Sequence, residues 1–254
     1  MQNLKKPLII LVAIAFLIAV VASLTMLFSV KKVEAVFSVY GESEAQEIQK
    51  ELDAFNGKNI VFLKLSEVIA SCDKFPYYEI TSAEKVYPNV IKVAVYKRAE
   101  VFKIDNADKA YVLDKDGIVL NDEGKTEFPR NVLSLDIGNL SVVGGAVGEK
   151  IQTSDDALFY SVLKTSQALK LNDSVKQVEI AKSEYGDFRD AVFKTYTGVT
   201  INVWNVDDDG ENKIEAAFSC YESESDYKKT AYFINAYKKS DGNIVAEWTS
   251  HSGD

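Results

Sequence analysis

A long apolar run near the start of the chain dominates the pattern of hydrophobic and polar positions. Residues 7–30 contain no charged side chain. As a helix rising 1.5 Å per residue, this run measures about 36 Å, enough to cross a hydrocarbon core of about 30 Å with some tilt. The alternative is a secretory signal peptide that starts at Lys5 and Lys6 and is cleaved near residues 20–22. Because the apolar core of a signal peptide is usually only about 7–15 residues long, we predict an uncleaved transmembrane helix over residues 7–30.

The lengths of the flanking segments decide the predicted topology. Lys5 and Lys6 before the run are matched by Lys31 and Lys32 after it, so the count of basic residues does not favour either orientation. The short head, residues 1–6, cannot fold, whereas the rest of the chain can, and a large domain is translocated largely regardless of its charge. We therefore predict a single-pass protein of the cell membrane with a cytoplasmic N-terminus and extracytoplasmic C-terminal domains.

The segment after the apolar run alternates between strand and helix patterns. A β-rich stretch at residues 33–40 ends at Gly41, and residues 43–46 (Ser-Glu-Ala-Gln) have the form of a capping box, which predicts the start of a helix. The apolar positions on one face of this helix are Ile48, Leu52 and Phe55. A second helix is predicted from Ser66 to Pro76. Its inward positions are Val68, Ile69 and Cys72.

Two alternating strands complete this first predicted domain. They cover residues 78–86 and 91–96 and are joined by a Tyr-Pro-Asn turn at residues 87–89. The resulting order over residues 31–100 is β-α-α-β-β, which resembles a POTRA domain, a module of secretion, assembly and division proteins. Its strands and helices can cover one another's apolar faces.

The rest of the chain reads as a second domain, residues 101–249, followed by a tail at 250–254. Strands are predicted at residues 101–104, 110–113, 118–120, 175–181, 188–196, 199–204, 231–237 and 244–248. The loop of residues 138–152 precedes an amphipathic helix at 155–171, and Ile214, Ala217, Phe218 and Tyr221 form the apolar stripe of a later helix. The predicted fold class is therefore α+β, with a mainly antiparallel β domain that carries two helices.

Charge and cysteine content narrow the classes of partner. The chain has a net charge of −9, and since Lys5 and Lys6 lie in the head and the apolar run has no charge, the remainder carries −11. An acidic domain of this kind is a poor ligand for nucleic acid. Cys72 and Cys220 lie far apart in sequence; an exported domain permits a bridge between them, but we favour two unbridged small hydrophobic residues.

The motifs that suggest chemistry are incomplete. The sole histidine, His251, lies in the polar tail, and the Gly-rich segment 144–150 has Glu149 before Lys150 where a phosphate-binding loop needs glycine. The Asp-rich segments 114–117 and 207–210 lack the ligand spacing of a calcium loop and are predicted to be hairpin turns. We predict no catalytic residue, cofactor or metal. An envelope hydrolase with a pair of carboxylates that converge in space stays open.

Three stretches between residues 87 and 120 share a pattern with a known family. They are residues 87–93 (Tyr-Pro-Asn-Val-Ile-Lys-Val), 96–101 (Tyr-Lys-Arg-Ala-Glu-Val) and 111–120 (Tyr-Val-Leu-Asp-Lys-Asp-Gly-Ile-Val-Leu). The pattern resembles the FtsQ/DivIB family of bacterial cell-division proteins, although Lys97 and Glu100 stand where that family commonly has glutamate and proline. The resemblance extends over the whole chain and includes its end, where Asn235 and Ala236 replace charged residues of the family's strand.

The resemblance implies a division protein without enzymatic activity that binds FtsB/DivIC-like and FtsL-like partners at the septum. The family's β domain receives a strand or helix of the partner in its final part, and an unpaired strand edge with aromatic anchors suits that role. The candidate partner-binding residues are Tyr232, Phe233, Ile234, Asn235, Ala236, Tyr237 and Trp248. Ordinary core and edge packing is an equal alternative for them. The alternative function is a POTRA-containing envelope-assembly or export component that binds client polypeptides by strand addition.

Overall fold

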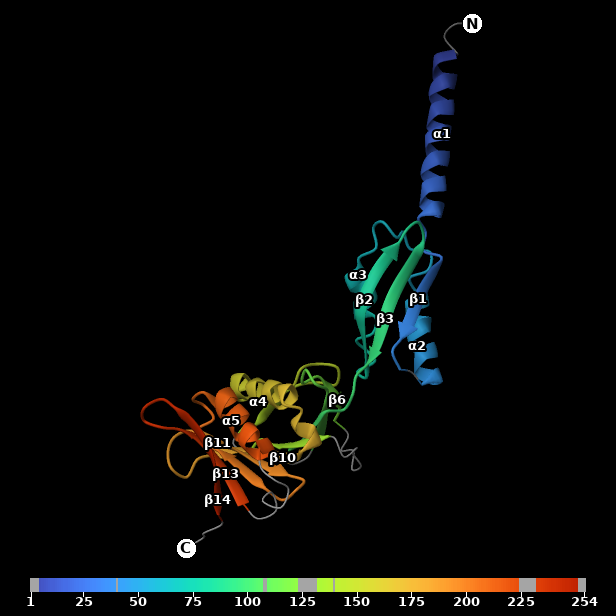
Figure 1. The fold of residues 1–254 in the computed structure, drawn as a ribbon. Helices are drawn as coiled ribbons and strands as arrows, with labels where there is room; N and C mark the ends of the chain where they lie inside the picture. The colour runs from blue at the N-terminus through green and yellow to red at the C-terminus, as the bar shows by residue number, and fades with distance from the viewer. Residues whose placement is uncertain are drawn as a thin grey trace. The chain divides into compact units, whose positions relative to one another are not determined.

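The computed structural model of the protein describes residues 5–39, 41–106, 109–122, 132–138, 140–223 and 232–250. The chain divides into two compact units, Met1–Arg98 and Ala99–Asp254 (Figure 1). The first unit begins with helix α1 (Lys5–Leu27), and the side chains of Ile10–Leu27 are not buried inside the protein. This segment is long and apolar enough to cross a membrane, as predicted from the sequence.

The helix ends three residues before the apolar run does. Phe28, Ser29 and Val30 leave α1 and join the folded part of the first unit, where Val30 is only 2% exposed and its amide donates to the Lys58 carbonyl at 2.8 Å. The prediction that the helix extends to residue 30 is therefore wrong at this end. Val30 therefore belongs to the hydrophobic core of the folded part of the first unit, and Phe28 packs against that core.

The folded part of the first unit is a three-stranded sheet with two helices. It contains β1 (Lys32–Phe37), α2 (Glu42–Asp53), α3 (Leu65–Ala70), β2 (Tyr78–Val86) and β3 (Val90–Lys97). The sheet order is β1-β3-β2, with β1 parallel and β2 antiparallel to β3. A single hydrophobic core joins the elements, because Ile48 and Leu52 of α2 and Val68 of α3 are completely buried together with Ile91 of β3.

Two local predictions for this unit are wrong. The helix α2 begins after Gly41, which has no side-chain capping bond, and Ser43 lies inside the first turn, where its hydroxyl donates to the Glu44 carboxylate at 3.1 Å. The expected capping box therefore does not form. In α3, Val68 is buried but Ile69 is 41% exposed, since the next residue of a helix turns by about 100° away from the buried position.

The second unit is built on one nine-stranded sheet of order β14-β13-β12-β11-β10-β7-β4-β5-β6. The strands are β4 (Phe102–Asn106), β5 (Lys109–Leu113), β6 (Val119–Asn121), β7 (Leu133–Asp136), β10 (Val175–Lys182), β11 (Arg189–Thr195), β12 (Thr200–Val203), β13 (Tyr232–Lys238) and β14 (Ile244–Ser250). Five of the eight neighbouring pairs are antiparallel, so the sheet is mixed but mainly antiparallel.

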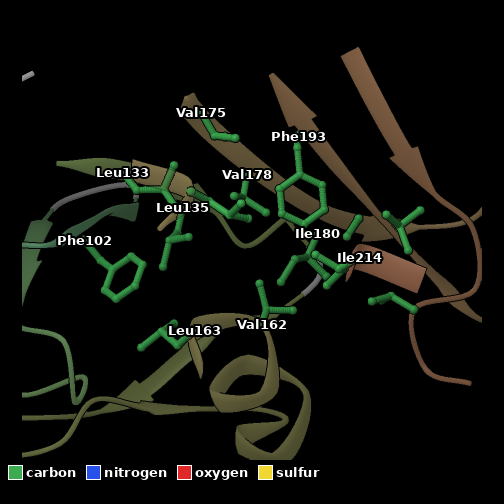
Figure 2. Packing of buried hydrophobic residues seen from close by; sticks show 14 of the residues in the cluster. Phe102, Leu133, Leu135, Val162, Leu163, Val175, Val178, Ile180, Phe193 and Ile214 are labelled. Carbon is green, nitrogen blue, oxygen red and sulfur yellow. The ribbon is translucent and has the colours of Figure 1, made fainter. Parts of the chain in front are cut away.

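Helices α4 (Asp156–Ala168) and α5 (Gly210–Ser223) contribute to the core of this sheet, and a short 3-10 helix, Leu171–Asp173, follows α4. Figure 2 shows Val162 and Leu163 of α4 and Ile214 of α5 directed at sheet residues that include Val178 and Phe193. These side chains are at most 2% exposed, so the apolar stripes predicted for the two helices do face the sheet.

Three features of the second unit differ from the sequence prediction. Strand β7, in the interior of the sheet, was not predicted. The segment predicted as a loop at residues 138–152 contains a small ribbon of β8 (Val142–Gly144) and β9 (Gln152–Thr153). The turn at residues 207–210 leads into α5 and is not a hairpin turn, whereas the turn at 114–117 does join the antiparallel strands β5 and β6.

Candidate protein-binding edge and outer face

The hairpin of β13 and β14 forms one end of the nine-stranded sheet. The two strands pair antiparallel from Tyr232↔Ser250 to Lys238↔Ile244. Gly242 adopts a left-handed φ of 87° in the connecting turn, which explains why a segment rich in turn formers closes the hairpin. Within the described part of the chain β14 has β13 as its only neighbouring strand, so its other edge presents backbone groups that can receive an added strand.

The backbone groups on that edge can be assigned from the hydrogen bonds of the turn. The Lys239 amide donates to the Asn243 carbonyl at 2.8 Å, and the register continues from there without a bulge. Because antiparallel pairs alternate between bonded and non-bonded, Val245, Glu247 and Thr249 bond to β13, while Ala246 and Trp248 point their amides and carbonyls outward. A bond from the Trp204 amide to the Ala236 carbonyl, at 2.9 Å, agrees with this phase because it directs Ala236 away from β14.

The predicted partner-binding residues divide between the two faces of the hairpin. Ile234 and Ala236 are completely buried in the core, and Trp248, opposite Ile234, is partly buried against the same cluster. Phe233, Asn235 and Tyr237 alternate with these residues and therefore lie on the other face, where they are half-buried. The side chain of Tyr232 lies outside the described residues.

The outer face carries an aromatic row that the sequence analysis missed. The ring of Tyr237 stacks on the ring of Trp204 at 5.6 Å between centroids. The ring of Tyr185 also contacts Trp204, with 6.3 Å between the two centroids. Trp204 is 40% exposed and Tyr185 is 80% exposed. Trp204 follows β12 and Tyr185 lies between β10 and β11, so only the sheet order brings them to Tyr237. The row gives this face a rigid apolar surface that is accessible to a partner.

A polar stripe runs beside the aromatic row and fixes the side chains of the hairpin. Asn202 Nδ2 donates to Asn235 Oδ1 at 2.9 Å, and Asn235 Nδ2 donates to Thr249 Oγ1 at 2.9 Å, so one stripe crosses β12, β13 and β14. The Tyr237 hydroxyl donates to the Glu247 carboxylate at 3.0 Å, and this bond raises the pKa of the phenol. The outer face is therefore ordered before any partner arrives.

A buried lysine supports this face from below. Lys213 of α5 is only 1% exposed, and its ammonium group donates to the carbonyls of Trp204 at 3.1 Å and Asn205 at 2.8 Å. Burial lowers the pKa of Lys213. Since a buried ammonium group must be fully hydrogen-bonded, these two bonds hold the end of β12 in place. No pattern in the sequence indicates this role of Lys213.

A polar cleft of about 520 Å³ lies elsewhere in the second unit, at the N-terminal ends of α4 and α5. Arg189 donates to the Asp155 carboxylate at 2.8 Å and also pairs with Asp207. The Leu158 amide and Arg189 hold the pKa of the Asp155 carboxyl below its usual range. Arg189 therefore joins Asp155 and Asp207 in one ion-paired cluster at this cleft.

The other residues considered for chemistry are distributed as follows. Among the residues that the structure describes, no group of three or more His, Cys, Asp or Glu side chains is placed to hold a metal ion. Cys72 and Cys220 are not joined by a disulfide bond, and Cys72 is buried. His251 lies outside the described residues. The Asp114 carboxylate accepts the amides of Asp116 and Ile118, both at 2.8 Å, which gives it a structural role in the β5–β6 turn.

Comparison with known proteins yields one informative relative. No family model matches the chain. The chain is similar to the cell division protein DivIB of Clostridium acetobutylicum, with 25% identity over 182 residues, which cover 72% of this chain and 70% of that protein. The relative agrees with the resemblance to the FtsQ/DivIB family and supports membership of that family.

Proposed function

We propose that this member of the FtsQ/DivIB family is a non-enzymatic scaffold that binds FtsB/DivIC-like and FtsL-like proteins at the division septum. The relative is a cell division protein, and α1 is an apolar helix suited to a single-pass anchor. The observation that carries the proposal is the open edge of β14 beside an ordered outer face. In this proposal the N-terminus is cytoplasmic and the folded units are extracytoplasmic.

Strand addition to β14 is the binding mode that these features favour. The outward amide and carbonyl of Ala246 would bond to an extended segment of the partner beside β14, and a further part of the partner would cover Phe233, Tyr237 and Trp204, which lie farther into the sheet on and next to β13 and β12. Backbone bonds supply affinity with little sequence preference, so specificity would come from the aromatic row and the polar stripe. In this reading Ile234, Ala236 and Trp248 contribute through the core that supports the hairpin.

We propose a separate role for each of the two units. We assign residues 31–100 as a POTRA-like domain, in view of the β-α-α-β-β order of the first unit, and residues 101–249 as the family's β domain. The β14 edge belongs to the second unit, so the proposal places partner capture there. In this proposal the first unit holds the second unit at the outer side of the membrane.

The test is retention of the partners by the full-length protein. The chain is purified from detergent-solubilised membranes of cells that co-express the DivIC-like and FtsL-like proteins of its host. Retention of both proteins, together with a midcell band of a fluorescent fusion, is the expected result. Loss of both partners from a folded, monodisperse preparation would refute the scaffold, and retention of unfolded envelope clients in their place would favour the assembly or export function.

A further inference from the structure

Three segments of the first unit meet where the chain leaves α1. The Val30 amide donates to the Lys58 carbonyl and the Gly57 amide to the Val30 carbonyl, both at 2.8 Å. The Lys31 amide donates to the Asn89 carbonyl, also at 2.8 Å. Figure 1 shows the matching arrangement of the sheet, in which β1 and β3 begin and β2 ends on one side. We call residues 28–32, 54–65 and 86–90 the α1-proximal surface.

This surface must lie close to the bilayer if α1 crosses it. From Pro7 to Leu27 a helix measures about 31 Å, which matches a hydrocarbon core of about 30 Å and places Leu27 at its boundary. Three further residues reach at most about 10 Å, so Val30 and the loops bonded to it lie within or next to the headgroup layer. The position of this surface depends on the membrane anchor and is independent of any division partner.

The α1-proximal surface exposes large apolar side chains. Phe62 is 83% exposed, Tyr87 is 57% exposed and Val61 is 46% exposed. The Tyr87 ring also contacts Phe28 edge-on, at 6.3 Å between centroids, and Phe28 directly follows α1. Single exposed apolar residues are common, but these come from separate loops that are held to the exit of one membrane helix. Aromatic side chains at that depth prefer the membrane–water interface.

The charge of this surface is opposite to that of the chain. Residues 28–32, 54–65 and 86–90 contain the exposed lysines Lys31, Lys32, Lys58 and Lys64 and no aspartate or glutamate. The whole chain has a net charge of −9. Of the acidic residues just beyond the segments, Glu34 is paired with Lys32 at 3.1 Å. Lysines that lie within a Debye length of an anionic leaflet are attracted to it.

We propose that the α1-proximal surface is a lipid-binding site that seats the first unit on the bilayer, with Phe62 inserted between headgroups and Lys58 and Lys64 against anionic phosphates. The occupant is the anionic phospholipid surface of the same bilayer that holds α1. Such a seat would restrict the tilt of the first unit relative to the membrane beyond what the connection through residues 28–31 imposes.

The experiment uses the full-length protein in nanodiscs of phosphatidylcholine and phosphatidylglycerol that contain bromine-labelled acyl chains. The variant Phe62→Trp places an indole at the inserted position, and the unmodified chain supplies the background from Trp204 and Trp248. The matched control is Val39→Trp, because Val39 is also an apolar site that is exposed, at 65%. Val39 lies beyond the far end of β1, and that end is about 17 Å from Lys32 along the strand.

Bromine should quench the emission gained by Phe62→Trp and leave the emission gained by Val39→Trp unchanged. Adding Lys58→Glu and Lys64→Glu to Phe62→Trp, or omitting phosphatidylglycerol, should reduce that quenching. Absence of quenching at Phe62→Trp in a folded protein would overturn the proposal, including the case in which the indole is buried by a protein partner. Quenching that is insensitive to both charge changes would overturn the role of the lysines.

Discussion

A single proline in β14 separates the outer edge of the sheet from its inner hydrogen bonds. The Ala246 amide points away from β13, so Ala246→Pro removes a donor from the open edge while the bonds of Val245 and Glu247 to β13 stay intact. Proline is tolerated on an edge strand when its missing amide faces solvent. The variant should therefore fold and keep its free energy of unfolding within about 1 kcal/mol of the unmodified protein.

The expected effect on binding follows from the lost bond and its consequences. A hydrogen bond contributes about 1 kcal/mol net, and the partner carbonyl that loses its donor costs a further 1–3 kcal/mol when it is buried. The proline ring also occupies the space that an added strand needs. The sum is about 2–4 kcal/mol, which corresponds to a dissociation constant about 30- to 700-fold higher.

The assay is titration of full-length Ala246→Pro in nanodiscs with the DivIC-like protein that we propose as its partner, alongside urea denaturation followed by tryptophan fluorescence. Glu247→Pro is the matched control, because the same substitution one residue later removes a donor to β13 and should destabilise the fold. Unchanged affinity of a folded Ala246→Pro variant would refute strand addition at β14. Partner binding would then have to use the outer face alone.

Three further predictions concern residues away from that edge. Replacing Asp114 by alanine removes a buried acceptor of two backbone amides and should lower the free energy of unfolding by about 2–4 kcal/mol in urea titrations. Burial raises the pKa of the Cys72 thiol to about 11, so an aromatic disulfide reagent at pH 8 should modify Cys220 first and Cys72 only on unfolding. The lowered pKa of Asp155 stabilises the fold above its ordinary value near 3.8 and ceases to do so as the pH falls through the folded-state pKa. Between pH 5 and about pH 2, the melting temperature of the Asp155→Asn variant should therefore fall by less than that of the unmodified protein.

Strands in which apolar and polar residues alternate over the whole length were predictable from the local sequence. Strand β2 has the predicted bounds of 78–86, because its residues alternate and a Tyr-Pro-Asn turn follows it. Strand β7 has only four residues, so its pattern was too short to detect, although its position between β10 and β4 buries Leu133 and Leu135. Its place depends on parallel pairing with strands distant in sequence, which no local window contains.

The candidate site was predictable as a hairpin but not as a surface. Alternation within residues 232–237 gives two faces, yet it does not state which face meets the core. The contribution of Trp204 and Tyr185 was hidden for a second reason, since they approach Tyr237 only through the order of β10, β11, β12 and β13. The role of Lys213 was hidden because its partners are backbone carbonyls, which every sequence contains.

The connection between β12 and β13 resolves the ambiguity of the two faces. These strands are parallel neighbours, so the chain must cross from the end of one to the start of the other, and α5 makes part of that crossing. Its apolar stripe, which includes Ile214 and Phe218, joins the core and so assigns Ile234 and Ala236 to the inner face. The opposite face and the outer edge of β14 are thereby left to the aromatic row, the polar stripe and the outward backbone groups. Stability and partner binding therefore depend on alternate residues of one hairpin, and this is why substitutions one position apart in β14 are expected to separate the two.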